Sequence, residues 1–222
     1  MATTTRREGR SRIAGLPTRD IALGLVRAVL DDHRSLTNTL EDGIAGQEKA
    51  SAPDRAFGRL IAMTTLRRLG EIDAMIDALL QRPLPRKALD VQHILRIAAA
   101  QTAFIGTASH AVVNCAVEQA KRTTGRYGPL VNAISRRFVS VKEGEPPTDP
   151  SVNVPGWLWA SWVKAYGPDA AARIGRAHQT EPPLDLTIAT AGDSVQWAET
   201  LDGQILIPGT IRLPRAQNVP TL

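Results

Sequence analysis

The chain of 222 residues contains one cysteine, Cys115. A single thiol cannot form an intramolecular disulfide, and it excludes a zinc site made of several cysteines. The lack of disulfides suits a reducing compartment, so we expect a cytoplasmic protein. Aromatic residues make up only 4% of the sequence, so the core has to consist mainly of aliphatic side chains and alanine, which favours helices.

Long apolar segments are also missing. No run approaches the roughly 18 apolar residues that a membrane-spanning helix requires. The first residues, MATTTRREGRSRIAG, are basic but lack the apolar centre of a secretory signal. We expect residues 1–17 to be a flexible basic arm, which contains Arg6, Arg7, Arg10 and Arg12. Such arms often bind nucleic acid, although ends without a function are equally common.

Signatures of enzymes are scarce. No glycine-rich loop for a nucleotide or dinucleotide is present. Asp31-Asp32-His33 contains metal-ligating residue types, but carboxylates at a helix end are usually solvated, so we assign no metal site. Cys115 lies in the second turn of an expected helix, where a lowered pKa would make it a nucleophile. Burial as a small apolar residue is the favoured interpretation. We therefore assign no catalytic residue and no cofactor to this chain.

The sequence is rich in positive charge. Lys and Arg number 27 against 22 Asp and Glu, for a net charge of +5 and a pI near 9.9. Basic proteins bind polyanions because neutralised phosphates release condensed counterions. Net charge says nothing about the fold, and a basic protein without such a partner is the alternative.

Apolar residues recur at helical spacing through the first two thirds of the chain. This spacing predicts helices that begin near Thr18, Ser35, Ser51 and Glu71. Thr18, Ser35 and Ser51 are expected to cap the N-termini of their helices. Ser51-Ala52-Pro53-Asp54 is close to a capping box with proline in the first turn. The segment 89–105 is apolar on most of its circumference, which predicts a central buried helix.

A helical hairpin is expected at 109–139. Two amphipathic helices are joined by a short basic turn that contains Gly125 and Gly128-Pro129. Their apolar faces predict a buried seam, and around the turn we expect a cationic rim that binds RNA: Lys121, Arg122, Arg126, Arg136 and Arg137. Arginine matches the geometry of phosphate. The alternative is a solvated helix end whose cations interact with the helix dipole.

The composition changes after Val141. Residues 142–155 are rich in proline and form a predicted linker. Residues 156–222 predict short helices and at most three strands, which is little for an independent fold. All four tryptophans lie in this region, where they could stack on bases or pack in a core. The predicted fold class is mainly α: a helical bundle followed by a small, incomplete α/β unit.

Several motifs resemble a known family. Val113–Lys121 (VNCAVEQAK) and Leu130–Phe138 (LVNAISRRF) look like the paired signature of NusB-type RNA-binding domains. SAPDRAF, LRRLG, RPLPRK and LRIAAA resemble the NusB-like N-terminal domain of the bacterial RsmB/Sun family, which are rRNA (cytosine-5)-methyltransferases dependent on S-adenosylmethionine. VPGWLWASWVKAYG and EPPLDLTI are similar to the start of that family's pre-catalytic unit.

The resemblance implies a NusB-like bundle of about seven helices at 18–141 and the start of a pre-catalytic RNA-recognition domain at 156–222. The family's cofactor domain, with its glycine-rich motif and catalytic cysteines, would follow near Leu222. Cys115 stands where related sequences tend to have glutamate. The implied function is to position small-subunit rRNA for a catalytic domain of the parent protein, without catalysis or S-adenosylmethionine in this chain alone.

The alternative implied by the resemblance is a NusB-like transcription antitermination factor that binds RNA and a ribosomal protein. The unit after the linker disfavours it, because such factors lack one. An autonomous enzyme would depend on Cys115 alone.

Overall fold

A computed structural model describes residues 13–43, 50–138, 149–189 and 193–213. The predicted basic arm up to residue 12, residues 142–148 of the predicted linker and the last nine residues lie outside these ranges. Contacts divide the chain into two compact units, Met1–Gly175 and Arg176–Leu222.

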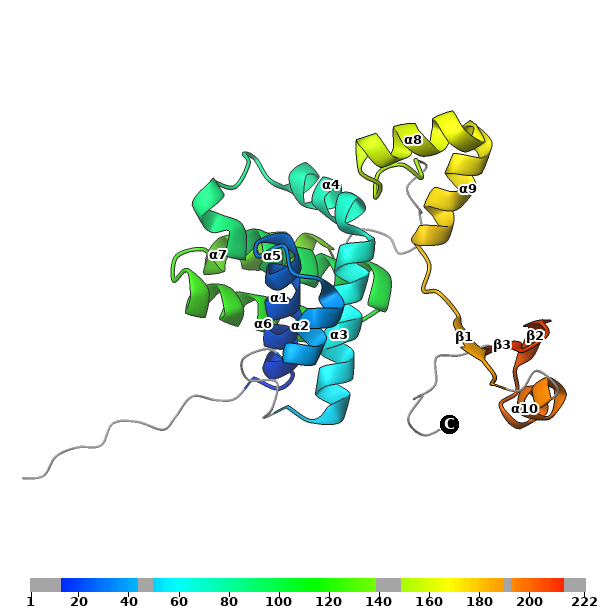
Figure 1. Ribbon diagram of the computed structural model, residues 1–222. Helices are drawn as coiled ribbons and strands as arrows, with labels where there is room; N and C mark the ends of the chain where they lie inside the picture. The colour runs from blue at the N-terminus through cyan, green and yellow to red at the C-terminus, as the bar shows by residue number, and fades with distance from the viewer. Residues whose placement is uncertain (1–12, 44–49, 139–148, 190–192, 214–222) are drawn as a thin grey trace, which may run out of the picture. The chain divides into compact units, whose positions relative to one another are not determined.

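The first unit contains the predicted bundle (Figure 1). Its elements are α1 (Leu16–Leu30), α2 (Leu36–Asp42), α3 (Ala52–Arg67), α4 (Leu69–Leu79), the 3-10 turn η2 (Arg86–Ala88), α5 (Leu89–Ala100), the π-helical turn η3 (Gln101–Ile105), α6 (Ser109–Thr123) and α7 (Gly128–Phe138). These seven α-helices confirm the expected class.

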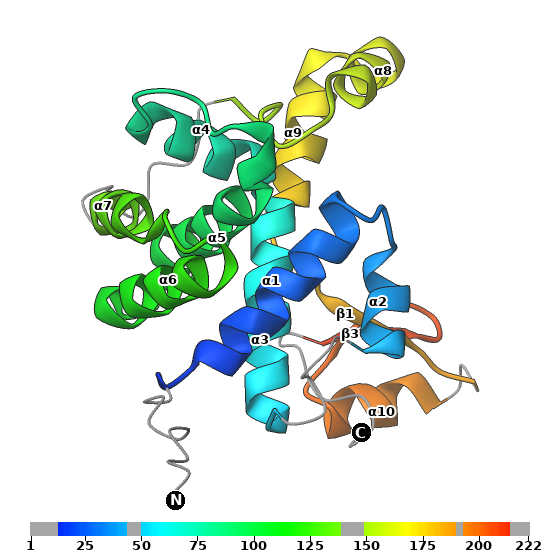
Figure 2. The same cartoon turned by 90° about the vertical axis from the view of Figure 1, so that its left-hand side faces the viewer.

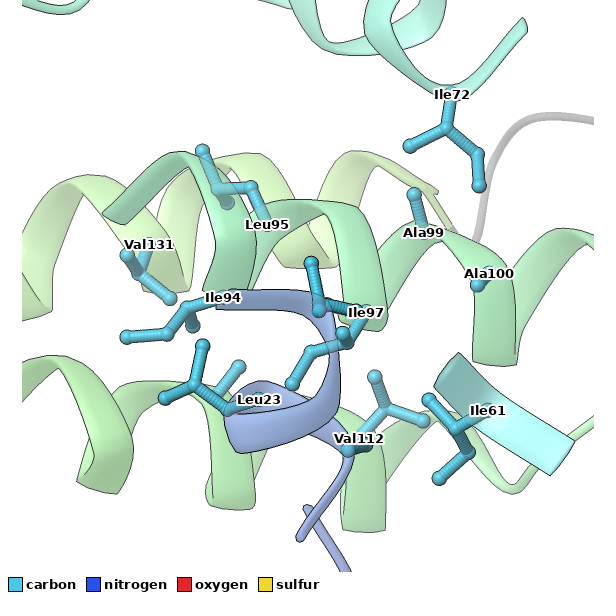
Figure 3. Packing of buried hydrophobic residues seen from close by; sticks show 14 of the residues in the cluster. Leu23, Ile61, Ile72, Ile94, Leu95, Ile97, Ala99, Ala100, Val112 and Val131 are labelled. Atoms are coloured by element: carbon cyan, nitrogen blue, oxygen red, sulfur yellow. The ribbon is translucent and has the colours of Figure 1, made fainter. Parts of the chain in front are cut away.

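Helix α5 is the centre of the bundle, as its apolar circumference predicts. It packs against α1, α3, α4, α6 and α7. Figure 3 shows Leu23, Ile61, Val112 and Val131 from four of these helices around the side chains of α5. Ile94 of α5 is fully buried, and burying such a side chain contributes roughly 1.5–3 kcal/mol.

Helices α1 and α3 form a close pair (Figure 2). A Cβ at Gly58 would lie 2.9 Å from the Thr18 carbonyl oxygen, so glycine permits this approach. The prediction that Thr18 caps α1 is wrong. The helix begins earlier, at Leu16, because Pro17 fits the first turn. Thr18 instead donates a hydrogen bond to Asp54 of α3, at 2.7 Å.

The other two predicted caps are confirmed. The Ser35 hydroxyl accepts a hydrogen bond from the amide of Asn38 at 3.1 Å. The Ser51 hydroxyl accepts one from the amide of Asp54 at 3.2 Å and donates to the Asp54 carboxylate at 2.6 Å. Each cap satisfies an amide that the first helical turn leaves unpaired.

The first unit also includes helix α8 (Gly156–Tyr166) and most of α9 (Pro168–His178). The division therefore falls later than the predicted linker. The segment before α8 is bound to α4: Asn153 accepts a hydrogen bond from the amide of Glu71 (3.0 Å) and donates to its carboxylate (2.5 Å). Gly70 makes this possible, because a Cβ there would overlap the carbonyl oxygen of Val152.

The second unit contains a small antiparallel sheet. Its strands are β1 (Leu184–Thr187), β2 (Gln204–Ile207) and β3 (Thr210–Leu213), in the order β1-β3-β2, and helix α10 (Ser194–Thr200) packs on β2 and β3. Leu184 pairs with Leu213 and Ile205 with Ile211. In the described part of this unit, the expectation of short helices and at most three strands is confirmed.

Candidate nucleic-acid interface

The predicted hairpin is formed by α6 and α7, which pack closely together (Figure 1). Val112, Ala116 and Ala120 of α6 are buried, as are Val131 and Phe138 of α7. Apolar residues at spacings of three and four produce such a seam. The seam leaves the charged faces of both helices in solvent.

Three predicted cations lie near the turn between the helices, and all three are exposed. Arg122 is partly neutralised: it contacts Glu118 at 3.1 Å and Asp20 of α1 at 3.5 Å. Arg126 lies over the ring of Tyr127, 4.9 Å from its centroid. Lys121 lies in the last turn of α6. Lys121 and Arg126 are therefore the cations of this turn that are better placed for a phosphate.

Arg136 and Arg137 do not lie beside the turn, and the expectation that all five cations gather there is wrong. They occupy the last turn of α7. Arg136 is eight residues after Gly128, the first residue of α7, which on a helix with a rise of 1.5 Å per residue is about 12 Å. Both side chains are exposed. The rim is therefore two separate groups of cations at opposite ends of α7.

The far end of α7 adjoins the end of α4. Arg137 donates a hydrogen bond to the carbonyl oxygen of Leu79 at 3.4 Å. Arg136 donates to Asn132 one turn before it, at 3.1 Å. Leu79 is the last residue of α4, so the chain enters the loop that leads to α5 at this point.

A sequence model of the NusB family matches residues 16–140, the part of the chain that contains α1 to α7. The chain belongs to the NusB family. The match covers more than half of the sequence and both helices of the hairpin.

The same chain resembles longer proteins. "Ribosomal RNA small subunit methyltransferase B" of Xanthomonas campestris pv. campestris is 32% identical over 162 residues, 72% of this chain and 36% of the relative. The protein of that name from Shigella flexneri serotype 5b is 29% identical over 192 residues, 83% of this chain and 43% of the relative. The chain thus spans less than half the length of these curated relatives, and the predicted resemblance is confirmed.

A solved structure, "Crystal Structure of PH0851", shares the fold with a TM-score of 0.56 at 14% identity. The likeness covers 95% of this chain and 51% of that one. It therefore extends beyond the NusB-family bundle.

Cys115 is fully buried within the NusB-family bundle. Its Sγ donates to the carbonyl oxygen of Ala14 at 3.6 Å. Burial raises the pKa of the thiol, and the nearby Arg19 guanidinium only partly offsets this. A raised pKa is the opposite of what a nucleophile needs. Packing is therefore the interpretation that the structure supports.

The buried Arg19 on α1 is a polar residue of the bundle that the periodicity of the sequence does not single out. Its Nε donates to Gln101 at 2.8 Å, its Nη1 donates to the carbonyl oxygen of Gly15 at 3.1 Å, and it lies 5.2 Å from the centroid of the Phe57 ring. These contacts account for its burial, since buried charges need hydrogen-bond partners. Its role in the structure is to join three elements of the bundle.

Asp31 belongs to the segment Asp31-Asp32-His33, whose residue types can bind metals. Its carboxylate lies 3.1 Å from the ring of the buried His93 of α5. The other ring nitrogen of His93 lies 3.0 Å from Arg96, which is paired with Asp73. Within the described ranges, no group of three or more His, Cys, Asp or Glu side chains could hold a metal ion. Those ranges also contain no helix long and apolar enough to cross a membrane.

The tryptophans differ in exposure. Trp157 of α8 is 75% exposed and Trp197 of α10 is 40% exposed. Trp159 instead lies close to α9: its ring would be 3.3 Å from a Cβ placed on Gly175. Trp157 and Trp159 thus have different surroundings, because residues two positions apart do not share a helical face.

Proposed function

We propose that this chain is the RNA-recognition part of an rRNA small-subunit methyltransferase and that it positions small-subunit rRNA for methylation of cytosine at carbon 5. The observation that carries the proposal is the hairpin of α6 and α7, whose exposed cations flank a buried seam in a NusB-family bundle. The names of the matched relatives supply the class of substrate.

In this proposal the phosphates of the RNA bind Lys121, Arg126, Arg136 and Arg137, and Arg122 contributes if it leaves its acidic partners. Guanidinium groups bind phosphate oxygens through paired hydrogen bonds. The basic arm adds charge to the same RNA. The setting is the cytoplasm, and the partner in the parent protein is its catalytic domain.

Methyl transfer belongs to the parent protein, with S-adenosylmethionine as the methyl donor. This chain supplies binding and orientation, and it is not catalytic alone. Cys115 takes no part, because a buried thiol with a raised pKa is a poor nucleophile.

The test is the affinity for labelled fragments of small-subunit rRNA at several salt concentrations. A variant with Lys121→Gln and Arg126→Gln should bind all fragments more weakly. Removal of each cation that binds a phosphate should flatten the slope of log Kd against log salt by about one. A matched control, Arg59→Gln with Arg173→Gln, removes the same charge from two exposed positions on other helices. Equal effects of the two pairs would contradict a specific site.

Two further measurements separate the alternatives. Incubation of the chain with labelled S-adenosylmethionine and rRNA should transfer no methyl group. Transfer would contradict the proposal that this chain is not catalytic alone. Tight binding of a purified ribosomal protein would favour an antitermination factor.

A further inference from the structure

Arginine side chains lie over aromatic rings at three places in the described part of the chain: Arg19 over Phe57, Arg68 over Phe104 and Arg126 over Tyr127. Arg19 is buried and hydrogen-bonded inside the bundle. Arg68 is bound to Glu71 at 3.0 Å. Arg126 is exposed, and the contacts of its guanidinium within the described ranges are with Tyr127. The pair at the α6–α7 turn is therefore the one that a ligand can reach from solvent.

Two contacts hold the guanidinium of Arg126 on Tyr127. Its Cζ lies 4.9 Å from the centroid of the ring, and its Nη2 donates a hydrogen bond to the phenol oxygen at 3.2 Å. Because Arg126 is exposed, the side of the guanidinium away from the ring is open to solvent. A second planar group can stack on that side.

The turn that carries this pair is fixed on both sides of it. Tyr127 packs against the core of the bundle, and its carbonyl oxygen accepts a hydrogen bond from the amide of Val131 at 2.9 Å. On the other side, Gly125 has a φ of 67°, which glycine adopts without strain. The amide of Arg126 donates to the carbonyl oxygen of Thr124 at 2.7 Å. A ligand that binds such a turn orders little additional chain, so less conformational entropy is lost on binding.

Lys121 lies beside the same turn. A Cβ placed on Gly128 would be 3.4 Å from the Cγ of Lys121 and 3.9 Å from its Cε, so the aliphatic part of Lys121 runs along the residue that follows Tyr127. The ammonium group of a lysine binds phosphate as a point charge, whereas a guanidinium also stacks through its plane. The turn thus offers a charge for a phosphate next to a plane for a base.

We propose that Arg126 and Tyr127, which we call the stacking pair, bind one unpaired base of the RNA, with Lys121 on an adjacent phosphate. The inference rests on the proposed function and deepens it by naming the form of RNA that the turn recognises. Unpaired bases stack on aromatic rings and on guanidinium planes. In a duplex each base is already stacked between its neighbours, so the stacking pair selects single-stranded or looped nucleotides. Every base has a stacking face, so the contact tolerates different sequences.

The decisive variant is Arg126→Lys in the full chain, which keeps the positive charge and removes the plane. The matched control is Arg59→Lys, at an exposed position on α3. The probes are a labelled single-stranded fragment of small-subunit rRNA that the wild-type chain binds, and the duplex of this fragment with its complement. Their Kd values are measured at several salt concentrations, and far-ultraviolet circular dichroism checks that each variant is folded.

Arg126→Lys should weaken binding of the single-stranded fragment about five- to tenfold. The slope of log Kd against log salt should stay unchanged, because loss of a stacked base releases no counterions. Affinity for the duplex should stay as in the wild type, and the control should change neither affinity.

The other outcomes separate this inference from the proposed function. Equal losses of affinity for the single strand and the duplex would identify a phosphate contact and overturn the inference. If Arg126→Lys matches Arg59→Lys on both RNAs, the inference also fails, while the proposed function stands as long as the variant with Lys121→Gln and Arg126→Gln weakens binding. If the wild-type chain binds neither RNA, both fail.

A second measurement observes the stacked base directly. The fluorescent base analogue aminopurine replaces one base of the single-stranded fragment at a time, and its emission falls when it stacks on another planar group. The wild-type chain should change the emission at one position in a way that Arg126→Lys does not. If the wild type and the variant change the emission equally at every position, no base stacks on Arg126 and the inference is wrong.

Discussion

The helical bundle and the three-stranded unit differ in how much apolar surface they bury. The bundle has a continuous core to which α1 and α3 to α7 contribute. In the described part of the second unit, the fully buried apolar side chains are Ile211 and Leu213, both on the central strand. Strand β2 has all four residues exposed. The bundle is therefore stable by its own core, whereas the sheet is near the lower limit for independent stability.

Truncation of an apolar side chain should give the largest difference between the two units. Ile94→Ala in the bundle should lower the free energy of unfolding by about 2–5 kcal/mol, because it leaves a cavity among fully buried neighbours. Ile207→Ala on β2, where the side chain is 63% exposed, should change it by less than about 0.5 kcal/mol. Urea unfolding followed by circular dichroism measures both. Similar losses of unfolding free energy in the two variants would contradict the proposed difference between the two units.

A change at Gly70 should have a smaller effect on the same measurement. A methyl group there overlaps the Val152 carbonyl, so the segment must move and its two hydrogen bonds with Glu71 weaken. We expect Gly70→Ala to cost about 1–3 kcal/mol and to speed hydrogen exchange of residues 150–154. Gly156→Ala, with no atom within 4 Å of its added Cβ, is the control. If the two variants are equally stable, the segment does not depend on Gly70.

The smallest effect on stability should come from a decrease in pH. Burial lowers the pKa of His93 below its ordinary 6.5, and its contact with Asp31 offsets part of this shift. Below this ordinary value the unfolded chain binds a proton that the folded chain does not, so stability is lost as the pH falls through 6.5 towards the lower folded pKa.

Thermal unfolding from about pH 7.5 to about pH 5.5 would measure this loss. His93→Asn should reduce the pH dependence in that window. A steeper dependence in His93→Asn would contradict the assignment.

Much of the fold can be predicted from the sequence because its helices are strongly periodic. The burial of α5 follows from an apolar circumference, and the caps at Ser35 and Ser51 follow from local spacing. The cap predicted at Thr18 is wrong because the partner of this residue, Asp54, is 36 positions away. The tie between Asn153 and Glu71 spans 82 positions. Hydrogen bonds between such distant residues have no signal in local periodicity.

The candidate interface is predictable only in part for the same reason. The hairpin and its exposed cations follow from helical spacing. The separation of Arg136 from the α6–α7 turn can be found by counting residues along α7. The ion pair of Arg122 with Asp20, and the approach of Arg137 to the end of α4, depend on how helices pack. Helical spacing places charges on each helix but does not determine which helices meet.

The single cysteine has a practical consequence. Its thiol, on α6, is fully buried and donates a hydrogen bond to the carbonyl oxygen of Ala14, two residues before α1 begins. A water-soluble thiol reagent can reach Cys115 only when this corner opens. The rate at which the reagent labels Cys115 therefore reports how often the native bundle opens at this place. No other cysteine has to be introduced.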